Sequence, residues 1–162
     1  MANTIDTQFG YPTALIGVIV GHLMAIELKA LHRAVVDILS LQSSENVLEV
    51  GFGPGTAIRR ASKQASFVAG IDVSNEMLQQ ANRRNRSAIR SGRVELVRAS
   101  VAAIPFSNDR FNAVFEVNTF HLWEEPVAGV REIRRVLQTG GRLLMALRKE
   151  NHSSLQSDMK PV

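Results

Sequence analysis

The chain has 162 residues and a mass of 17.8 kDa, with 45% apolar and 21% charged residues, a composition typical of one globular domain. It contains no cysteine, which excludes disulfides, thiolate metal sites and a cysteine nucleophile. Lysine and arginine outnumber aspartate and glutamate, for a net charge of +4. From the length and composition we expect a single core, and from the absence of cysteine a reducing, cytoplasmic location.

The first 40 residues have apolar side chains at helical spacing. Their apolar run, residues 14–26, is shorter than the ~20 residues that a membrane-spanning helix needs, so no membrane span is expected. We expect residues 1–44 to form a helical lid or cap, in which Tyr11 and His22 would line a substrate pocket. An ordinary packing helix is the alternative.

From residue 45 onward, short β-prone runs alternate with helical patterns. The strands are predicted at 47–50, 67–71, 94–98, 111–117 and 142–147. The helices are predicted over 56–66, from the N-cap Ser74 through Ile89, and over 126–138, where Gly140 and Gly141 would end the last one. This alternation predicts an α/β protein with a Rossmann-like, doubly wound, mainly parallel sheet and helices on both faces, over residues 45–148.

The turn after the first predicted strand reads EVGFGPGT, residues 49–56. Its glycines allow a ligand to approach the backbone closely, and the following helix start favours an anionic group. Thr56 occupies the last glycine position of the dinucleotide motif G-x-G-x-x-G, which disfavours NAD and FAD, and no P-loop sequence follows. A tight connection without a ligand is the alternative.

Asp72 ends the second predicted strand, about twenty residues beyond these glycines, where nucleotide-binding folds place a carboxylate. A carboxylate at this point can accept both hydroxyl groups of a ribose. Helix capping together with Ser74 is the alternative.

The positive charge is concentrated in residues 83–98, which contain six arginines and one acid. Such a run is typical of the solvated face of a helix and, less often, of a phosphate-binding patch. No aromatic side chain interrupts it to stack on bases, so nucleic acid is not the expected partner.

Four segments in this order and spacing resemble the class I S-adenosylmethionine-dependent methyltransferases of the small-molecule methyltransferase-11 type: VLEVGFGPG (47–55), GIDVSNEMLQQA (70–81), residues 94–123 and REIRRVLQTGGRLLMAL (131–147). The resemblance covers roughly residues 45–148. It implies S-adenosyl-L-methionine as the cofactor, S-adenosyl-L-homocysteine as the product and a small-molecule methyl acceptor, for example one of secondary metabolism.

The resemblance also implies the contacts of the cofactor. Glu49, with the backbone of Gly51 and Gly53, would hold its methionine part, and Gly55 would close the turn against the helix. Asp72 would take the ribose hydroxyls.

The remaining implied contacts follow three later turns. Val73 and Met77 would pack on the adenine ring, Ser100 and Val101 would lie at its edge, and Asn118 would lie beside the methionyl and sulfonium end. Ser100 stands where members of the family usually have an acid. A neutral hydrogen bond in place of a charged one predicts binding that is weaker by ~1 kcal/mol.

His121 follows the fourth predicted strand, on the side where a methyl acceptor must approach, and is the candidate proton acceptor. A histidine that only packs is the alternative. Phe120 and Trp123 could line the acceptor pocket or belong to the core. The sequence has no metal-ligand motif, so no metal is expected.

The family's sheet usually ends with two further strands, whereas residues 149–162 read here as a polar tail. The fifth strand would then be an exposed edge, which predicts a homodimer that covers it. Cover by the chain's own ends, or a shortened chain with impaired function, are the alternatives. Two other functions stay open: a non-methylating reaction such as cyclisation, and methylation of a nucleic acid or protein recruited by the arginine run.

Overall fold

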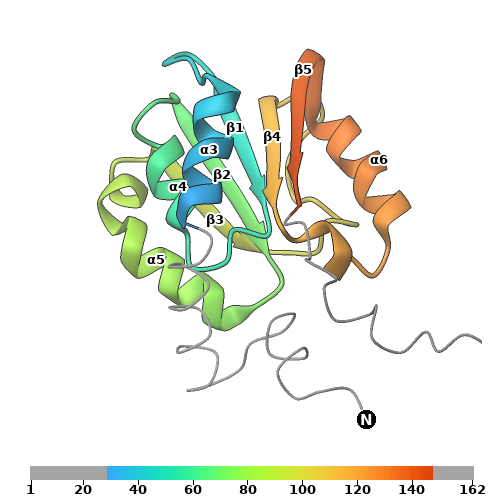
Figure 1. The fold of residues 1–162 in the computed structure, drawn as a ribbon, viewed down its shortest axis with the longest axis horizontal. Helices are drawn as coiled ribbons and strands as arrows, with labels where there is room; N and C mark the ends of the chain where they lie inside the picture. Colours follow the sequence, from blue (N-terminus) through green and yellow to red (C-terminus); the bar gives the residue numbers. More distant parts are fainter. Residues whose placement is uncertain (1–28, 148–162) are drawn as a thin grey trace, which may run out of the picture.

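The computed structural model describes residues 29–147, which form a sheet with helices on both faces (Figure 1). The elements follow in this order: α3 (Lys29–Leu39), β1 (Asn46–Val50), α4 (Thr56–Ala61), β2 (Phe67–Asp72), α5 (Asn75–Arg90), β3 (Val94–Arg98), β4 (Phe111–Val117), the 3-10 turn η1 (Phe120–Leu122), α6 (Pro126–Val136) and β5 (Leu137–Ala146).

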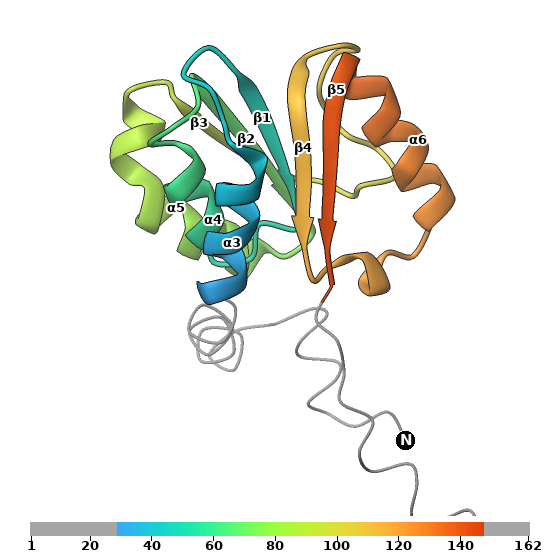
Figure 2. The ribbon, with the colours of Figure 1, turned by 45° about the horizontal axis from the view of Figure 1, so that its top comes forward.

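All five strands are parallel, in the order β3-β2-β1-β4-β5. The helices α3, α4 and α5 cover one face of the sheet, and α6 covers the other (Figures 1 and 2). This arrangement confirms the predicted Rossmann-like fold. The strand order reverses between β1 and β4, and ligands of such sheets bind at that point, beyond the carboxyl ends of the strands.

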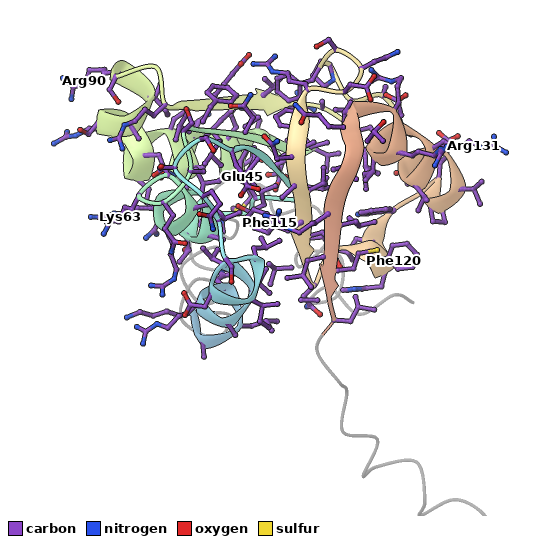
Figure 3. All side chains as sticks on the ribbon, turned by 90° about the horizontal axis from the view of Figure 1, so that it is seen from above. Glu45, Lys63, Arg90, Phe115, Phe120 and Arg131 are labelled. Carbon is purple, nitrogen blue, oxygen red and sulfur yellow. The ribbon has the colours of Figure 1, made fainter. Side chains whose placement is uncertain are left out.

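Two apolar clusters hold the layers together. The first lies under α3, α4 and α5 and includes the fully buried Val36, Ile58 and Ala113. The second lies under α6 and includes Leu48 and Ile133. In Figure 3, Phe115 of the first cluster lies in the interior, whereas Arg90 and Arg131 point away from the sheet on opposite sides. Burial of each large aliphatic or aromatic side chain stabilises the fold by roughly 1.5–3 kcal/mol.

Several element boundaries agree with the sequence. The strands 94–98 and 111–117 are observed as predicted. Ser74 is the N-cap of α5, because its Oγ accepts a hydrogen bond of 3.2 Å from the backbone N–H of Met77. The helix predicted over 56–66 is wrong at its end, since α4 stops at Ala61 and the next residues form tighter turns, with the Lys63 N–H bonded to the Arg60 carbonyl.

The junction of α6 and β5 also differs from the prediction. The helix ends at Val136, and β5 begins at Leu137 rather than at residue 142, because Leu137 is extended and pairs with Phe111. Gly140 and Gly141 therefore do not end the helix. They lie inside β5 where the register with β4 shifts, and a Cβ on Gly141 would lie 2.9 Å from the carbonyl oxygen of Gln138.

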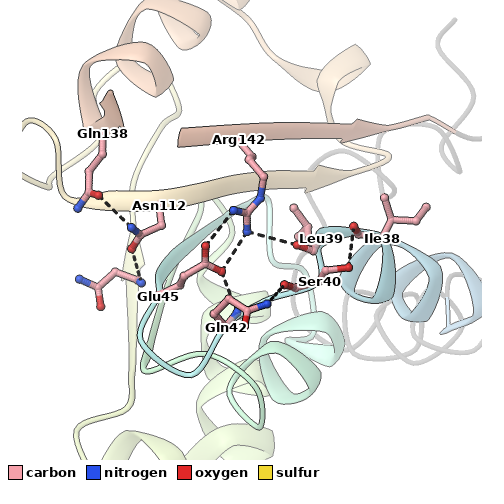
Figure 4. A network of polar contacts seen from close by, with 9 residues as sticks. Ile38, Leu39, Ser40, Gln42, Glu45, Asn112, Gln138 and Arg142 are labelled. Atoms are coloured by element: carbon pink, nitrogen blue, oxygen red, sulfur yellow. Dashed lines mark hydrogen bonds and ion pairs between the residues drawn. The ribbon is translucent and has the colours of Figure 1, made fainter. Parts of the chain in front are cut away.

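A polar network fastens β5 to the segment between α3 and β1 (Figure 4). Arg142 donates two hydrogen bonds to the carboxylate of Glu45, at 2.9 and 3.0 Å, and a third to the carbonyl of Leu39 at 3.3 Å. These hydrogen bonds from the Arg142 guanidinium hold the pKa of Glu45 below its usual range. The outermost strand is thereby tied to the first described helix.

His32 predicts how the stability of the fold depends on pH. Its side chain is 6% exposed on α3, and this burial lowers its pKa from 6.5 to about 4. Between pH 6.5 and about 4, His32 is protonated in the unfolded chain but not in the folded chain. The free energy of unfolding therefore falls by up to about 3 kcal/mol as the pH drops through this range. We expect His32→Leu to remove this part of the acid sensitivity in urea unfolding. The same loss of stability in both proteins would contradict the assignment.

Candidate functional site

The glycine turn between β1 and α4 lies at the carboxyl end of the central strand. Gly51 has φ = 72° and Gly53 has φ = 51°, both in the left-handed region. A Cβ on Gly51 would lie 2.5 Å from the side chain of Thr119, whereas a Cβ on Gly53 would meet no atom within 4 Å. Gly51 thus allows the turns after β1 and β4 to approach each other, and Gly53 borders open space that a ligand can enter.

This contrast predicts unequal effects of two alanine substitutions. Left-handed backbone costs a non-glycine residue about 1–2 kcal/mol, which applies to both positions. Gly51→Ala adds the overlap with Thr119, so we expect it to lower the free energy of unfolding clearly more than Gly53→Ala does. Urea unfolding of both variants tests this expectation. Equal losses would show that Thr119 moves aside freely.

Two residues of α5 hold the far side of the same turn. Arg84 donates from Nε to the carbonyl of Pro54 at 2.8 Å, and Asn85 donates from Nδ2 to the carbonyl of Gly55 at 3.1 Å. Gly55 has φ = 77° and packs against Ala81 of this helix. The turn is therefore closed against α5 as well as against α4, which its own sequence did not indicate.

Asp72 joins the glycine turn to the turn after β2. One carboxylate oxygen accepts from the backbone N–H of Gly53 at 2.8 Å, and the other accepts from the N–H of Ser74 at 2.9 Å. Burial raises the pKa of Asp72, and these backbone hydrogen bonds oppose the rise. Asp72 thus takes part in the start of α5, as its capping alternative predicted, and also positions the loop that borders the open space.

Glu49, on β1, is an acid of the site that is buried without a hydrogen-bond partner among the described residues. It is fully buried, and neither carboxylate oxygen accepts a hydrogen bond of normal geometry from a described residue. Burial raises its pKa well above the usual value, and the negative charge of Asp72 raises it further, although the nearby N–H of Ile58 partly opposes this. A buried acid without a partner is unfavourable, so its oxygens suit a ligand that brings positive charge or hydrogen-bond donors.

Glu116 on β4 is a second fully buried acid, which the sequence analysis missed. One oxygen accepts from the N–H of Thr119 at 2.8 Å and from the N–H of Phe120 at 3.1 Å, and the other has no partner among the described residues. Glu116 therefore shapes the turn in which Asn118, with φ = 58°, takes a left-handed conformation. A single acid inside the apolar strand FNAVFEV was the signal that could have identified it.

The residues predicted at the adenine ring differ in their exposure: two are exposed and two are buried. Val73 is 40% exposed, and Ser100 is exposed, with its Oγ accepting from the N–H of Ala102 at 3.2 Å. Met77 and Val101 are only 2% and 7% exposed and pack into the two core clusters. All four follow β2 or β3 at the carboxyl edge of the sheet.

The residues predicted on the acceptor side come together after β4. His121 is exposed in η1, and the rings of Phe120 and Trp123 meet edge to face with centroids 5.0 Å apart. Trp123 also packs against the cluster under α6, as its core alternative predicted. Tyr11 and His22 lie outside the described residues.

Half of the arginine run is bonded to the protein backbone. Arg84, Arg93 and Arg98 each donate to a backbone carbonyl at 2.8–3.0 Å, although Arg93 and Arg98 remain exposed. Arg83, Arg86 and Arg90 are exposed on α5. Within residues 29–147, no group of acidic and histidine side chains could hold a metal ion, and no helix is long and apolar enough to cross a membrane.

Comparison with known proteins identifies the family. The profile of the methyltransferase domain family matches residues 48–145. The chain is 31% identical over 131 residues to the uncharacterised methyltransferase YdaC of Bacillus subtilis, covering 80% of this chain and 70% of that one. It is also 31% identical over 108 residues to the 27-O-demethylrifamycin SV methyltransferase of Amycolatopsis mediterranei, covering 66% of this chain and 40% of that enzyme.

A solved structure agrees with these relatives. The S-adenosylmethionine-dependent methyltransferase of Aquifex aeolicus superposes with a TM-score of 0.65 at 26% identity, covering 80% of this chain and 68% of that one. The chain thus spans about two thirds or less of the length of several proteins that it matches. It belongs to the methyltransferase domain family, the class I S-adenosylmethionine-dependent methyltransferases, whose cofactor is S-adenosylmethionine.

Proposed function

We propose that this chain transfers a methyl group from S-adenosylmethionine to a small-molecule acceptor. The observation that carries the proposal is the meeting of Asp72 with the glycine turn, next to the unpartnered carboxylate of Glu49. Carboxylates accept hydrogen bonds from hydroxyl groups and attract positive charge. Their position beside an accessible turn, where the strand order reverses, therefore suits a ligand that carries both.

The cofactor fits these residues. S-adenosylmethionine supplies an electrophilic methyl group on a positively charged sulfur. The oxygens of Glu49 would accept from its ammonium group, and Asp72 would accept from its ribose hydroxyls. Gly53 leaves space beside the turn, and the exposed Val73 and Ser100 would border the adenine. Met77, Val101 and Asn118 would complete the walls.

On the acceptor side, the chain must place the attacking atom in line with the methyl group and exclude water. Phe120 and Trp123 would form an apolar wall there. His121 would accept the proton of a hydroxyl acceptor. We expect His121→Gln to lower kcat for a hydroxyl acceptor while the affinity for S-adenosylhomocysteine stays the same. A change in that affinity alone would contradict a role as base.

The name of the rifamycin relative supports an oxygen nucleophile on a small molecule. The test is to incubate the chain with S-adenosylmethionine and a panel of small hydroxylated compounds, and to detect S-adenosylhomocysteine and methylated product together by mass spectrometry. Product that depends on Asp72 supports the proposal. Cofactor that is bound but never consumed, with a changed substrate, would favour a non-methylating reaction such as cyclisation instead.

We also propose that a second copy of the chain covers β5, which lies at the end of the described sheet. A groove of about 480 Å³ runs between α6 and β5, beside the partly exposed Val130 (44%) and Leu143 (40%). The outer edge of β5 has no neighbouring strand in the described sheet, and an unpaired edge that carries apolar side chains such as Leu143 favours pairing with another strand. Light scattering should give the mass of a dimer, and Leu143→Arg should shift it towards the monomer. A monomer mass for the unaltered chain would contradict this.

The division into a lid (1–44), a cofactor-binding domain (45–148) and a tail (149–162) stays a proposal, as does a cytoplasmic location. Tyr11 and His22 would reach the acceptor from the lid. Limited proteolysis with and without S-adenosylhomocysteine tests the lid, because closure over the cofactor should protect residues 1–28 from cleavage, whereas α3 already packs against the sheet.

A further inference from the structure

A basic pocket lies between α3 and α4, which run side by side on one face of the sheet (Figures 1 and 2). Its volume is about 160 Å³, enough for a group of several heavy atoms. Its walls carry five cationic side chains, together with His32 and Thr56: Lys29, Arg33, Arg59, Arg60 and Lys63. None of these residues belongs to the set proposed for the cofactor or the acceptor.

The positive charge of this pocket is not balanced by the described residues around it. Among the described residues no carboxylate lines the pocket, and the one acid of α3 and α4, Asp37, is paired with Arg60 at 2.6 Å. The other four cations form no ion pair with a described residue. In Figure 3, Lys63 points away from the sheet. Like charges held around one cavity repel each other, so an anion inside it would relieve the repulsion.

Three buried polar atoms on the same walls have no hydrogen-bond partner among the described residues. They are Nδ1 of His32, Oγ1 of Thr56 and Nε of Arg60, and the His32 side chain as a whole is only 6% exposed. Burial lowers the pKa of His32 to about 4, so its ring is neutral at neutral pH and carries one N–H. All three atoms can donate a hydrogen bond. Buried donors without acceptors are rare in folded proteins, so each of them calls for an acceptor.

We propose that the pocket between α3 and α4 binds a phosphate group, either free or as the monoester of a small molecule. A phosphate supplies two negative charges and several acceptor oxygens in a tetrahedral arrangement, which suits cations and donors that converge from two helices. A planar carboxylate has one charge and two oxygens, and would leave more of these groups unsatisfied.

The surroundings favour a small ligand over a nucleic acid. The pocket is small, about 160 Å³, and none of the exposed arginines of α5 lines it. Half of the arginine run on and beside α5 is already bonded to backbone carbonyls of the protein. Within residues 29–147, no aromatic residue lines the pocket to stack on a base.

The test is a calorimetric titration of the full chain with inorganic phosphate and with glycerol 3-phosphate, in about 0.15 M sodium chloride to screen diffuse charge effects. We expect saturable binding at one site, with a Kd of about 1 mM or tighter for at least one of the two probes. Tighter binding of the monoester would assign the site to a phosphorylated small molecule, and tighter binding of inorganic phosphate would assign it to the free ion.

Two sets of variants make the test specific. Arg59→Gln with Lys63→Gln should weaken phosphate binding at least about tenfold, since hydrogen bonds to charged groups are removed. Arg83→Gln with Arg86→Gln changes the net charge equally on exposed α5 and should leave binding unchanged. Thr56→Val, which removes no charge, should also weaken it. The affinity for S-adenosylhomocysteine should be the same in the Arg59/Lys63 variant, so this result is independent of the proposed function.

Three results would overturn the proposal: no saturable binding of either probe, equal weakening by the α5 variant, or saturable binding of a single-stranded RNA oligonucleotide in the absence of phosphate binding. The first result would show that the pocket does not bind phosphate. The other two would show that the positive charge belongs to a surface that binds polyanions such as RNA.

Discussion

Replacing Asp72 with alanine is expected to weaken the binding of S-adenosylmethionine by about 100-fold. Two charge-assisted hydrogen bonds to the ribose would be lost, each worth about 1.5–3 kcal/mol, with part of that regained by water at this partly exposed site. The substitution also leaves the N–H groups of Gly53 and Ser74 without their acceptor, so the turn beside the cofactor loses its position.

Asp72→Asn separates these two effects. An amide oxygen can still accept one of the two backbone hydrogen bonds, but it carries no charge and cannot accept from both ribose hydroxyls. We expect the asparagine variant to regain most of the stability that alanine loses and to keep a clear defect in affinity. Full recovery of affinity in Asp72→Asn would show that Asp72 acts only on the turn.

Glu49→Gln should change stability and cofactor affinity in opposite directions. Glu49 is fully buried and has no hydrogen-bond partner among residues 29–147, so a neutral side chain of the same shape should stabilise the ligand-free chain by about 1–3 kcal/mol at neutral pH. The same substitution removes the negative charge that the ammonium group would meet, which should lower the affinity at least about tenfold. Urea unfolding and calorimetry measure the two effects.

The pH dependence provides the control for Glu49. Because the folded chain holds the Glu49 proton to a higher pH than the unfolded chain does, this residue's contribution to stability is present below the unfolded pKa and is lost as the pH rises through the folded pKa. Glu49→Gln should remove that loss. A variant that is less stable than the parent at every pH would indicate that the carboxylate has a structural partner.

The strands and the cofactor turn could be predicted because local sequence determines them. The runs VELVR and FNAVFEV are short and rich in β-prone residues. The turn over residues 51–55 has left-handed backbone, which glycine adopts more readily than other residues do. The α6–β5 junction could not be predicted in this way. Leu137 is extended because it pairs with Phe111, a residue 26 positions earlier in the chain, and no local signal reports that pairing.

The site shows the same division. Asp72 and Glu49 could be identified from their positions next to a glycine turn. Glu116 could not, because its role depends on backbone N–H groups that a folded turn brings to it. The exposure of Met77 and Val101 also depends on helix packing, which the sequence does not specify. The basic pocket arises only where α3 and α4 meet, although its residues lie in two separate segments of the chain.

The most direct test of the account is a calorimetric titration of the 162-residue chain with S-adenosylmethionine and S-adenosylhomocysteine, with Asp72→Ala as the control. We expect saturable binding of both compounds with a Kd of about 1–100 μM, lost or greatly weakened in the variant. A folded chain that binds neither compound, or that binds them equally well after Asp72→Ala, would contradict the assignment of the carboxyl edge of the sheet as the cofactor site.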